Sequence, residues 1–163
     1  MKENTGCEKL SEYIIDNKDR FYRIAFYYVH NSEDAMDIVS ESILKAYESY
    51  DKLGNPDKIK TWFYRILVNC CMDYFRRQKK ESPSESDYIL EEAFEEKAYD
   101  AELISIYKMV ESLPEKIRTV IILRYYEECS IEEIAKITGS GIGAVKYRLY
   151  TGIEKLKKLY GDE

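Results

Sequence analysis

The C-terminal part of the fold is decided by residues 127–160, EECSIEEIAKITGSGIGAVKYRLYTGIEKLKKLY. Ser130 and Glu133 have the spacing of a capping box, in which each side chain satisfies a backbone N–H group at the start of a helix. Gly139 is suited to end that helix, because glycine adopts the left-handed conformation of a helix end at little cost. A turn follows, and the pattern predicts a second helix from about Ile142.

The spacing of Ala135, Gly139 and Val145 is typical of a helix-turn-helix. A small residue lets the two helices approach, a glycine turns the chain, and a branched apolar residue anchors the second helix. Such a helix contacts base edges in the major groove from its N-terminal half. An ordinary helical hairpin with a solvated basic end has the same pattern, so this segment alone leaves both interpretations open. The residues expected to contact DNA are Ser140, Ala144, Lys146, Tyr147 and Arg148.

An acidic segment precedes this region. Residues 81–102 carry nine acidic side chains and one basic side chain, and they begin with sequence rich in Ser, Pro and Glu. This composition is typical of a linker. We therefore expect an N-terminal helical domain at 1–80 and a C-terminal helix-turn-helix domain at 103–163. In the latter, a helix from Glu115 to Tyr126 is expected to follow Pro114.

Apolar residues at steps of three and four predict three helices in the N-terminal half. They span about Leu10–Val29, Glu33–Tyr50 and Lys58–Lys80, and Ser32 is the expected N-cap of the second. The third helix has one apolar face to pack and one polar face to expose. Its apolar face is expected to consist of Ile59, Trp62, Phe63, Ile66, Cys70 and Tyr74. The predicted fold class is all-α, with two small helical domains joined by an acidic flexible linker.

The composition excludes several classes of function. No stretch approaches the about 20 apolar residues that cross a bilayer, so we expect a cytoplasmic protein without membrane insertion. The four cysteines form no C-x-x-C pair. The single histidine, His30, lies in no catalytic pattern and is expected to be exposed at a helix end. We expect no enzymatic activity, no metal, no cofactor and no small-molecule substrate.

The net charge of −6 is distributed unevenly along the chain. Residues 58–80 carry seven basic side chains and one acidic side chain, and residues 113–159 carry nine basic and six acidic side chains. Attraction to phosphates acts within a Debye length of about 8–10 Å, so local patches count for more than the average. Both segments therefore suit a nucleic-acid partner.

Three segments and their order along the chain support one further interpretation. They are SEDAMDIVSESILKAYESY (32–50), KTWFYRILVNCCMDYFRRQKK (60–80), and residues 113–159, which begin LPEKIRTVIILRYYEECS. In this order they resemble the extracytoplasmic-function group of the sigma-70 family of RNA polymerase sigma factors. The resemblance implies an alternative sigma factor that binds core RNA polymerase and directs promoter-specific transcription initiation. In the family, these segments bind the polymerase clamp helices, melt and read the −10 promoter element, and read the −35 element.

The resemblance implies a role in polymerase binding for one face of the helix at 32–50. Asp37 and Glu41 are four residues apart and so share a face, which suits a helical partner with a basic rim. A solvated acidic face would have the same pattern. The residues assigned to polymerase binding are Asp37, Ile38, Glu41 and Leu44.

The resemblance also implies contacts with −10 DNA from residues 58–80. Aromatic rings such as Trp62 and Tyr64 can stack on unpaired bases while basic side chains hold the backbone. Trp62 fits a place in the core equally well, and Asn69 and Asp73 could instead bond to neighbours on their own helix. The residues assigned to −10 DNA are Lys58, Lys60, Trp62, Arg65, Asn69, Asp73, Arg76, Arg77, Lys79 and Lys80.

The helix assigned to the −35 element departs from the family pattern, G-T-V-K-S-R-L-H-R-A-R. Here residues 143–153 are GAVKYRLYTGI, so Ala144 lacks a hydroxyl, Tyr147 replaces a small residue, and Thr151 and Ile153 replace basic residues. Fewer phosphate contacts imply weaker binding with a shallower salt dependence.

Two alternatives remain open from the sequence. A stand-alone helix-turn-helix regulator, which would bind duplex DNA without polymerase, shares the C-terminal motif but not the pattern at 60–80. The acidic linker suits either a basic channel of the polymerase or a solubilising spacer. The family also suggests an anti-sigma factor as a further partner.

Overall fold

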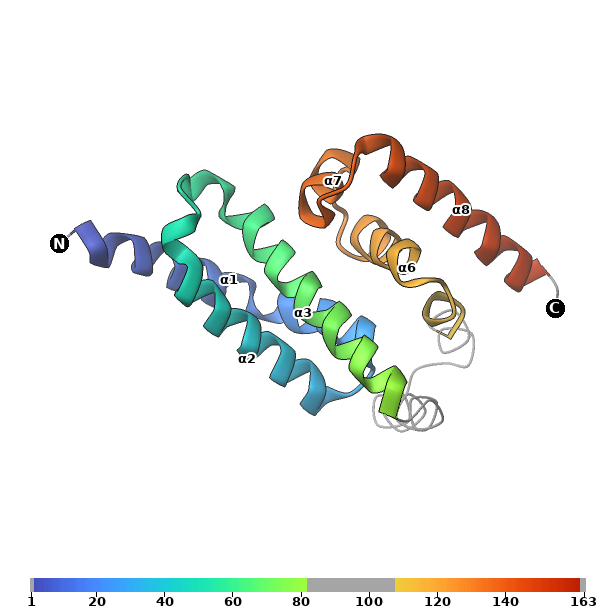
Figure 1. Ribbon diagram of the computed structural model, residues 1–163, viewed down its shortest axis with the longest axis horizontal. Coiled ribbons are helices and arrows are strands. Elements are labelled where there is room, and N and C mark those ends of the chain that lie inside the picture. The colour runs from blue at the N-terminus through green and yellow to red at the C-terminus, as the bar shows by residue number, and fades with distance from the viewer. Residues whose placement is uncertain (1, 82–107, 162–163) are drawn as a thin grey trace. The chain divides into compact units, whose positions relative to one another are not determined.

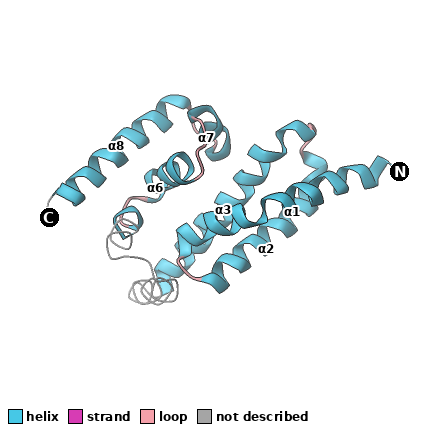
Figure 2. Cartoon of the chain, turned by 180° about the vertical axis from the view of Figure 1, so that it is seen from behind, coloured by secondary structure: helices cyan, strands magenta, loops and turns pink. Residues whose placement is uncertain are grey.

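The computed structural model describes residues 2–81 and 108–161, which form helices joined by turns, with no strand among them (Figures 1 and 2). Contacts divide the chain into two compact units, Met1–Ser86 and Asp87–Glu163. The predicted all-α fold class is confirmed. The predicted linker lies outside the described residues, apart from Glu81 at the end of a helix.

The N-terminal unit is a bundle of three helices, each of which contacts the other two (Figure 1). Its first two helices are antiparallel, because Ser11 shares a hydrogen bond with Tyr47, while Tyr22 donates one to Ser32 at 3.0 Å. The helices are α1 (Lys2–Val29), α2 (Ser32–Ser49) and α3 (Ile59–Glu81).

The helix boundaries differ from the predicted ones in informative ways. α1 begins at Lys2 rather than Leu10. The prediction of Ser32 as N-cap of α2 is wrong: Asn31 has the extended backbone of a cap, and its Oδ1 accepts from the Asp34 N–H at 2.9 Å. Before α3, two short 3-10 turns occupy Tyr50–Lys52 and Pro56–Lys58.

An aromatic cluster forms the centre of this unit. The rings of Phe21 and Phe63 stack with centroids 4.3 Å apart, and Tyr64 meets Phe21 edge-on at 5.9 Å. The predicted apolar face of α3 is therefore only partly right. Phe63 and Cys70 are buried as expected, together with Tyr64, Leu67, Val68 and Cys71. The other expected members are only half-buried, namely Ile59, Trp62, Ile66 and Tyr74.

His30 contradicts its prediction, because its side chain is only 3% exposed. The residue joins α1 to α2 with a φ of 54°, a left-handed conformation that turns the chain between the helices. Its ring packs edge-on against Phe26 of α1, with centroids 6.1 Å apart. A residue at a helix end is therefore buried here because the chain folds back on itself.

The C-terminal unit contains α6 (Glu115–Ile121), α7 (Ile131–Thr138) and α8 (Ile142–Gly161). α6 continues as a π-helical turn at Ile122–Tyr126, so the predicted helix extends as far as expected but changes its winding. Pro114 is the N-cap residue of α6.

The predicted helix-turn-helix geometry is confirmed. The N–H of Glu133 donates to Ser130 Oγ and the N–H of Ser130 donates to Glu133 Oε1, both at 3.1 Å, which completes the capping box at the start of α7. Gly139 ends α7 with a φ of 69°. α8 begins at Ile142, and Val145 and Leu149 are buried on its inner face.

Gly152 allows α8 to pack closely against α6. A Cβ at this position would lie 2.9 Å from Ile117 Cγ2 and 3.0 Å from Ile121 Cδ1. Real Cβ atoms essentially never approach other atoms so closely, so a side chain here would require Ile117, Ile121 or one of the helices to shift. The absence of a side chain at Gly152 thus allows α8 to lie close to α6.

Candidate nucleic-acid and polymerase interfaces

The outer face of α3 brings the predicted polar residues together. Arg65, Asn69, Asp73 and Arg76 are all exposed and follow one another at steps of three and four. Arg76 Nη1 lies 3.7 Å from Asp73 Oδ1, and both side chains are about half exposed. Such an exposed pair contributes little to stability, so both groups stay available to another charged ligand.

The basic residues assigned to −10 DNA occur at both ends of this face. Lys58 and Lys60 are exposed at the start of α3, and Arg77 is exposed near its end. Lys79 and Lys80 belong to the last turn of α3, but their side chains lie outside the described residues.

The two aromatic residues considered for base stacking, Trp62 and Tyr64, differ in how deeply they are buried. Tyr64 is in the core with 1% of its surface exposed, so the prediction that it contacts melted DNA is wrong. Trp62 is half-buried and meets the ring of Tyr50 edge-on, with centroids 6.0 Å apart. Trp62 therefore packs within the unit and still presents part of its ring to solvent.

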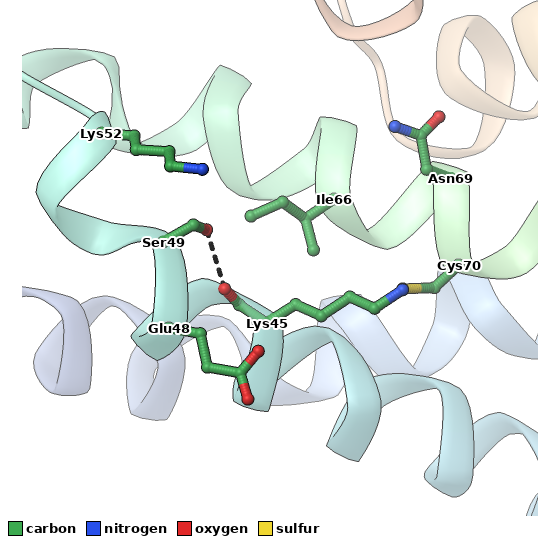
Figure 3. A pocket seen from close by; sticks show the side chains of 7 residues that line it. All are labelled: Lys45, Glu48, Ser49, Lys52, Ile66, Asn69 and Cys70. Carbon is green, nitrogen blue, oxygen red and sulfur yellow. Dashed lines mark hydrogen bonds between the residues drawn. The ribbon is translucent and has the colours of Figure 1, made fainter.

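A pocket of about 410 Å³ opens between the end of α2 and α3 (Figure 3). The Lys45 side chain extends across it toward Cys70, and Ser49 Oγ donates to the Lys45 carbonyl oxygen at 2.7 Å. The pocket combines two amines, a carboxylate, an amide and the apolar side chain of Ile66. Its lining residues are Lys45, Glu48, Ser49, Lys52, Ile66, Asn69 and Cys70.

Sequence reasoning identified Asn69 but missed Lys45 and Lys52, because these residues precede the predicted DNA segment and only the fold brings them beside it. Lys45 Nζ lies 3.4 Å from Glu41 Oε1. Electrostatic attraction to Cys70 raises the pKa of Lys45 above its ordinary value, and Glu41 adds to the effect. Lys45 is therefore a cation at neutral pH.

The outer face of α2 carries exposed apolar side chains towards one side and exposed carboxylates towards the other. Leu44 is 61% exposed and Met36 is 59% exposed, and the exposed carboxylates of Asp37 and Glu41 lie beside them. Ile38, which was assigned to this surface, is only 1% exposed and belongs to the core, because it lies on the opposite side of the helix. Sequence reasoning missed Met36 and Tyr47, although their spacing from Leu44 places them on its face.

The exposed face of α8 is aromatic as well as basic. Tyr147 and Tyr150 are 70% and 68% exposed, and Lys146 is exposed next to them. Ala144 is half-buried. Arg148 is also half-buried, and its Nη1 donates to Ser140 Oγ at 2.7 Å.

The cysteines do not form a reactive or metal-binding cluster in the described part of the chain. Cys7 is exposed, whereas Cys70, Cys71 and Cys129 are buried. Burial, and secondarily Cys70, raises the pKa of the Cys71 thiol well above its ordinary value, so Cys71 is a poor nucleophile. Among residues 2–81 and 108–161, no group of three His, Cys, Asp or Glu side chains could hold a metal ion.

Known proteins share both units of this chain. Sigma-70 region 2 matches residues 14–81, and sigma-70 region 4 matches residues 103–156. The RNA polymerase sigma factor SigV of Bacillus subtilis is 41% identical over 158 residues, which cover 96% of this chain and 93% of that protein. The chain belongs to the extracytoplasmic-function group of sigma-70 factors. The sigma-E factor of Escherichia coli, from the same group, is 32% identical over 77% of this chain and 73% of its own length.

Solved structures of sigma factors have the same fold. CnrH, solved with the cytosolic domain of CnrY, matches with a TM-score of 0.71 and 19% identity, covering 94% of this chain and 88% of that one. The sigma factor RpoE of Bartonella quintana, solved with the anti-sigma factor NepR, matches with a TM-score of 0.69 and 21% identity, covering 93% of this chain and 96% of that one.

As a member of this group, the chain is an alternative sigma factor that binds core RNA polymerase and directs promoter-specific transcription initiation. Similarity to a sigma factor along 96% of the chain decides against the stand-alone regulator. Sigma factors are non-enzymatic initiation factors. In the described part of the chain, no helix is long and apolar enough to span a membrane.

Proposed function

We propose that the two units divide the work of promoter recognition. Residues 1–80 bind core polymerase and hold the melted −10 element, and residues 103–163 bind the −35 element as a duplex. Residues 81–102 join them. The observation that carries the proposal is the row of exposed polar side chains on α3 next to a pocket that Lys45, Lys52 and Asn69 help to line (Figure 3). The chain acts in the cytoplasm and catalyses no reaction itself.

Polymerase binding is assigned to the outer face of α2. Exposed apolar groups beside exposed carboxylates suit a helical partner that has both apolar and basic side chains. The surface consists of Met36, Asp37, Glu41, Leu44 and Tyr47, with Ile38 supporting it from the core.

Binding of one unpaired nucleotide is assigned to the pocket between α2 and α3. The Lys45 and Lys52 amines suit a phosphate, the Asn69 amide can bond to a base edge, and Ile66 offers an apolar contact. Opening a duplex loses base stacking, and contacts to the unpaired strand offset part of that loss. Arg65, Arg76 and Arg77 are assigned to the adjacent strand backbone.

Run-off transcription with purified core RNA polymerase tests this division. Promoter-specific transcripts are expected only with this chain present, and replacing either promoter element is expected to abolish them. Leu44→Arg should abolish core binding, whereas Leu159→Arg, the same change at an exposed leucine of α8, should leave it intact. Core binding that survives Leu44→Arg would remove α2 from the polymerase interface.

An anti-sigma partner is a further proposal. It is supported by the fold shared with the Bartonella sigma factor RpoE, which was solved with the anti-sigma factor NepR. We expect the product of a neighbouring gene to bind this chain and to inhibit run-off transcription in proportion to its concentration. No inhibition by any neighbouring product would remove this partner from the proposal.

A further inference from the structure

A hydrogen bond inside the helix-turn-helix ties the recognition helix to the turn before it. Arg148 Nη1 donates to Ser140 Oγ at 2.7 Å, across eight residues of sequence. Ser140 is itself held in place, because its N–H donates to the Ala135 carbonyl oxygen at 3.0 Å. A short bond to a fixed partner restricts the rotation of a long arginine side chain.

Arg148 lies at the flank of α8 rather than at the centre of its exposed face. Val145 and Leu149 on one side of it are buried, while Tyr147 and Tyr150 on the other side are mostly exposed. Arg148 is half-buried between them. Side chains at the centre of a recognition helix reach base edges, and those at its flank lie nearer the phosphate backbone.

We propose that Ser140 is a positioning residue that orients the Arg148 guanidinium toward a phosphate of the −35 duplex. The inference rests on the proposed binding of the −35 element by α8. A guanidinium carries five N–H donors in a planar fork. The bond to Ser140 uses a donor on Nη1 and leaves the edge formed by Nε and Nη2 to pair with two phosphate oxygens. Ser140, which the sequence assigned to DNA directly, thus acts through Arg148.

The advantage of this arrangement is pre-organisation. An arginine that is free in solution loses rotamer freedom when it binds, whereas one that is already oriented loses less. Removing Arg148 should therefore weaken −35 binding more than removing the Ser140 hydroxyl. Because phosphates are the same at every base pair, both changes should weaken binding on all sequences by the same factor.

The test measures binding of reconstituted holoenzyme to −35 duplex over a range of salt concentrations. Arg148→Ala should weaken binding about tenfold and reduce the slope of log K against log salt by about one. Ser140→Ala should weaken it about threefold, and Ser140→Thr, which keeps the hydroxyl, should restore it. In the Arg148→Ala background, Ser140→Ala should have no further effect.

Thr138→Ala is the matched control. It removes a hydroxyl from the same turn region, but Thr138 Oγ1 donates to the Ile134 carbonyl oxygen of its own helix, at 2.8 Å. DNA binding should not change in this variant. Arg148→Lys keeps the charge but loses the planar fork, and its binding should not depend on Ser140.

Three outcomes would overturn the proposal, and they can be told apart. If Ser140→Ala reduced the affinity for −35 duplex equally in the parent and in the Arg148→Ala background, Ser140 would not act through Arg148. A loss confined to the −35 sequence would show that Arg148 contacts a base. Unchanged affinity and salt slope in Arg148→Ala would remove Arg148 from the DNA interface, which is a failure of the underlying proposed function.

Discussion

The two helices assigned to DNA, α3 and α8, differ in how they are held and in what they expose. α3 packs against both other helices of its unit, and it exposes a row of charged and amide groups beside a pocket. α8 packs against α6 and α7 through buried Val145 and Leu149, approaches α6 closely at Gly152, and carries Tyr147 and Tyr150 on its exposed face. Both helices therefore rest on a core, but α8 also depends on a close helix contact that only glycine permits, whereas α3 exposes charged and amide groups. Mutations and salt should affect the two helices differently.

The largest effect is expected from filling the space at Gly152. Gly152→Val would place a branched side chain within about 3 Å of Ile117 and Ile121, so the C-terminal unit should lose about 3 kcal/mol of stability. Denaturant unfolding followed by far-UV circular dichroism measures this loss. Core polymerase binding should persist, because the N-terminal unit has its own core.

Gly143→Ala is the matched control for Gly152→Val. Gly143 also lies in α8, but a Cβ there would meet no atom within 4 Å. The stability of this variant should equal or slightly exceed that of the parent, since alanine favours helix. If both variants had the parent's stability, close packing at Gly152 would not determine the position of α8.

On α3, replacing an exposed polar residue is predicted to reduce function without reducing stability. Asn69→Ala should make open-complex formation less favourable by about 2 kcal/mol, or roughly 30-fold, because it removes the amide that we propose to bind an unpaired base. Permanganate reactivity of promoter thymines measures the opening. Folding should be unaffected, since Asn69 is exposed.

Asn17→Ala is the control for this change, because Asn17 lies on α1, away from the pocket lining, and its Nδ2 donates to the Tyr13 carbonyl oxygen at 2.8 Å. Promoter opening should be the same as in the parent. Opening reduced equally in both variants would show that the effect does not come from the pocket.

Sequence patterns were informative where the determinants are local. The capping box of Ser130 and Glu133 and the left-handed Gly139 involve neighbours a few residues apart, so their spacing predicts their geometry. The same reasoning failed where contacts with an element distant in the sequence determine whether a residue is buried. His30 is buried by the return of the chain, and Tyr64 is buried because α3 has two packing partners.

The candidate site shows the same limit. Lys45 and Lys52 line the pocket with Asn69 only because α2 ends beside α3. Ile38 lies at a helical step of three from buried Ala35 and is itself buried, whereas Met36 is 59% exposed, so the assignment of Ile38 to the polymerase surface failed because this residue packs in the core. The importance of Gly152 was not visible in the sequence, because the atoms that exclude a side chain there belong to α6.

A smaller effect is expected at the start of α7. Ser130→Ala removes one half of the capping box and should cost about 1 kcal/mol, measured by denaturant unfolding of the C-terminal unit. Glu133→Gln should cost less, because glutamine also serves in a capping box. If Glu133→Gln lowered the stability of the unit as much as Ser130→Ala, the main capping bond would not be the one made by the serine.

The smallest effect concerns the aromatic face of α8. Tyr147 and Tyr150 offer apolar surface on a helix that has fewer cations than the family pattern, and apolar groups in the major groove contact the methyl group of thymine. Replacing thymines of the −35 element by deoxyuridine removes only those methyl groups, and it should weaken holoenzyme binding by about 0.5 kcal/mol per contacted base. Because no charge changes, the salt slope should stay the same, unlike the effect of losing a cation. In Tyr147→Ala, the loss of binding caused by deoxyuridine should be smaller than in the parent. An equal loss in both proteins would mean that the methyl groups contact another residue. In that case the contrast between an aromatic α8 and a cationic α3 would not extend to how the two helices bind DNA.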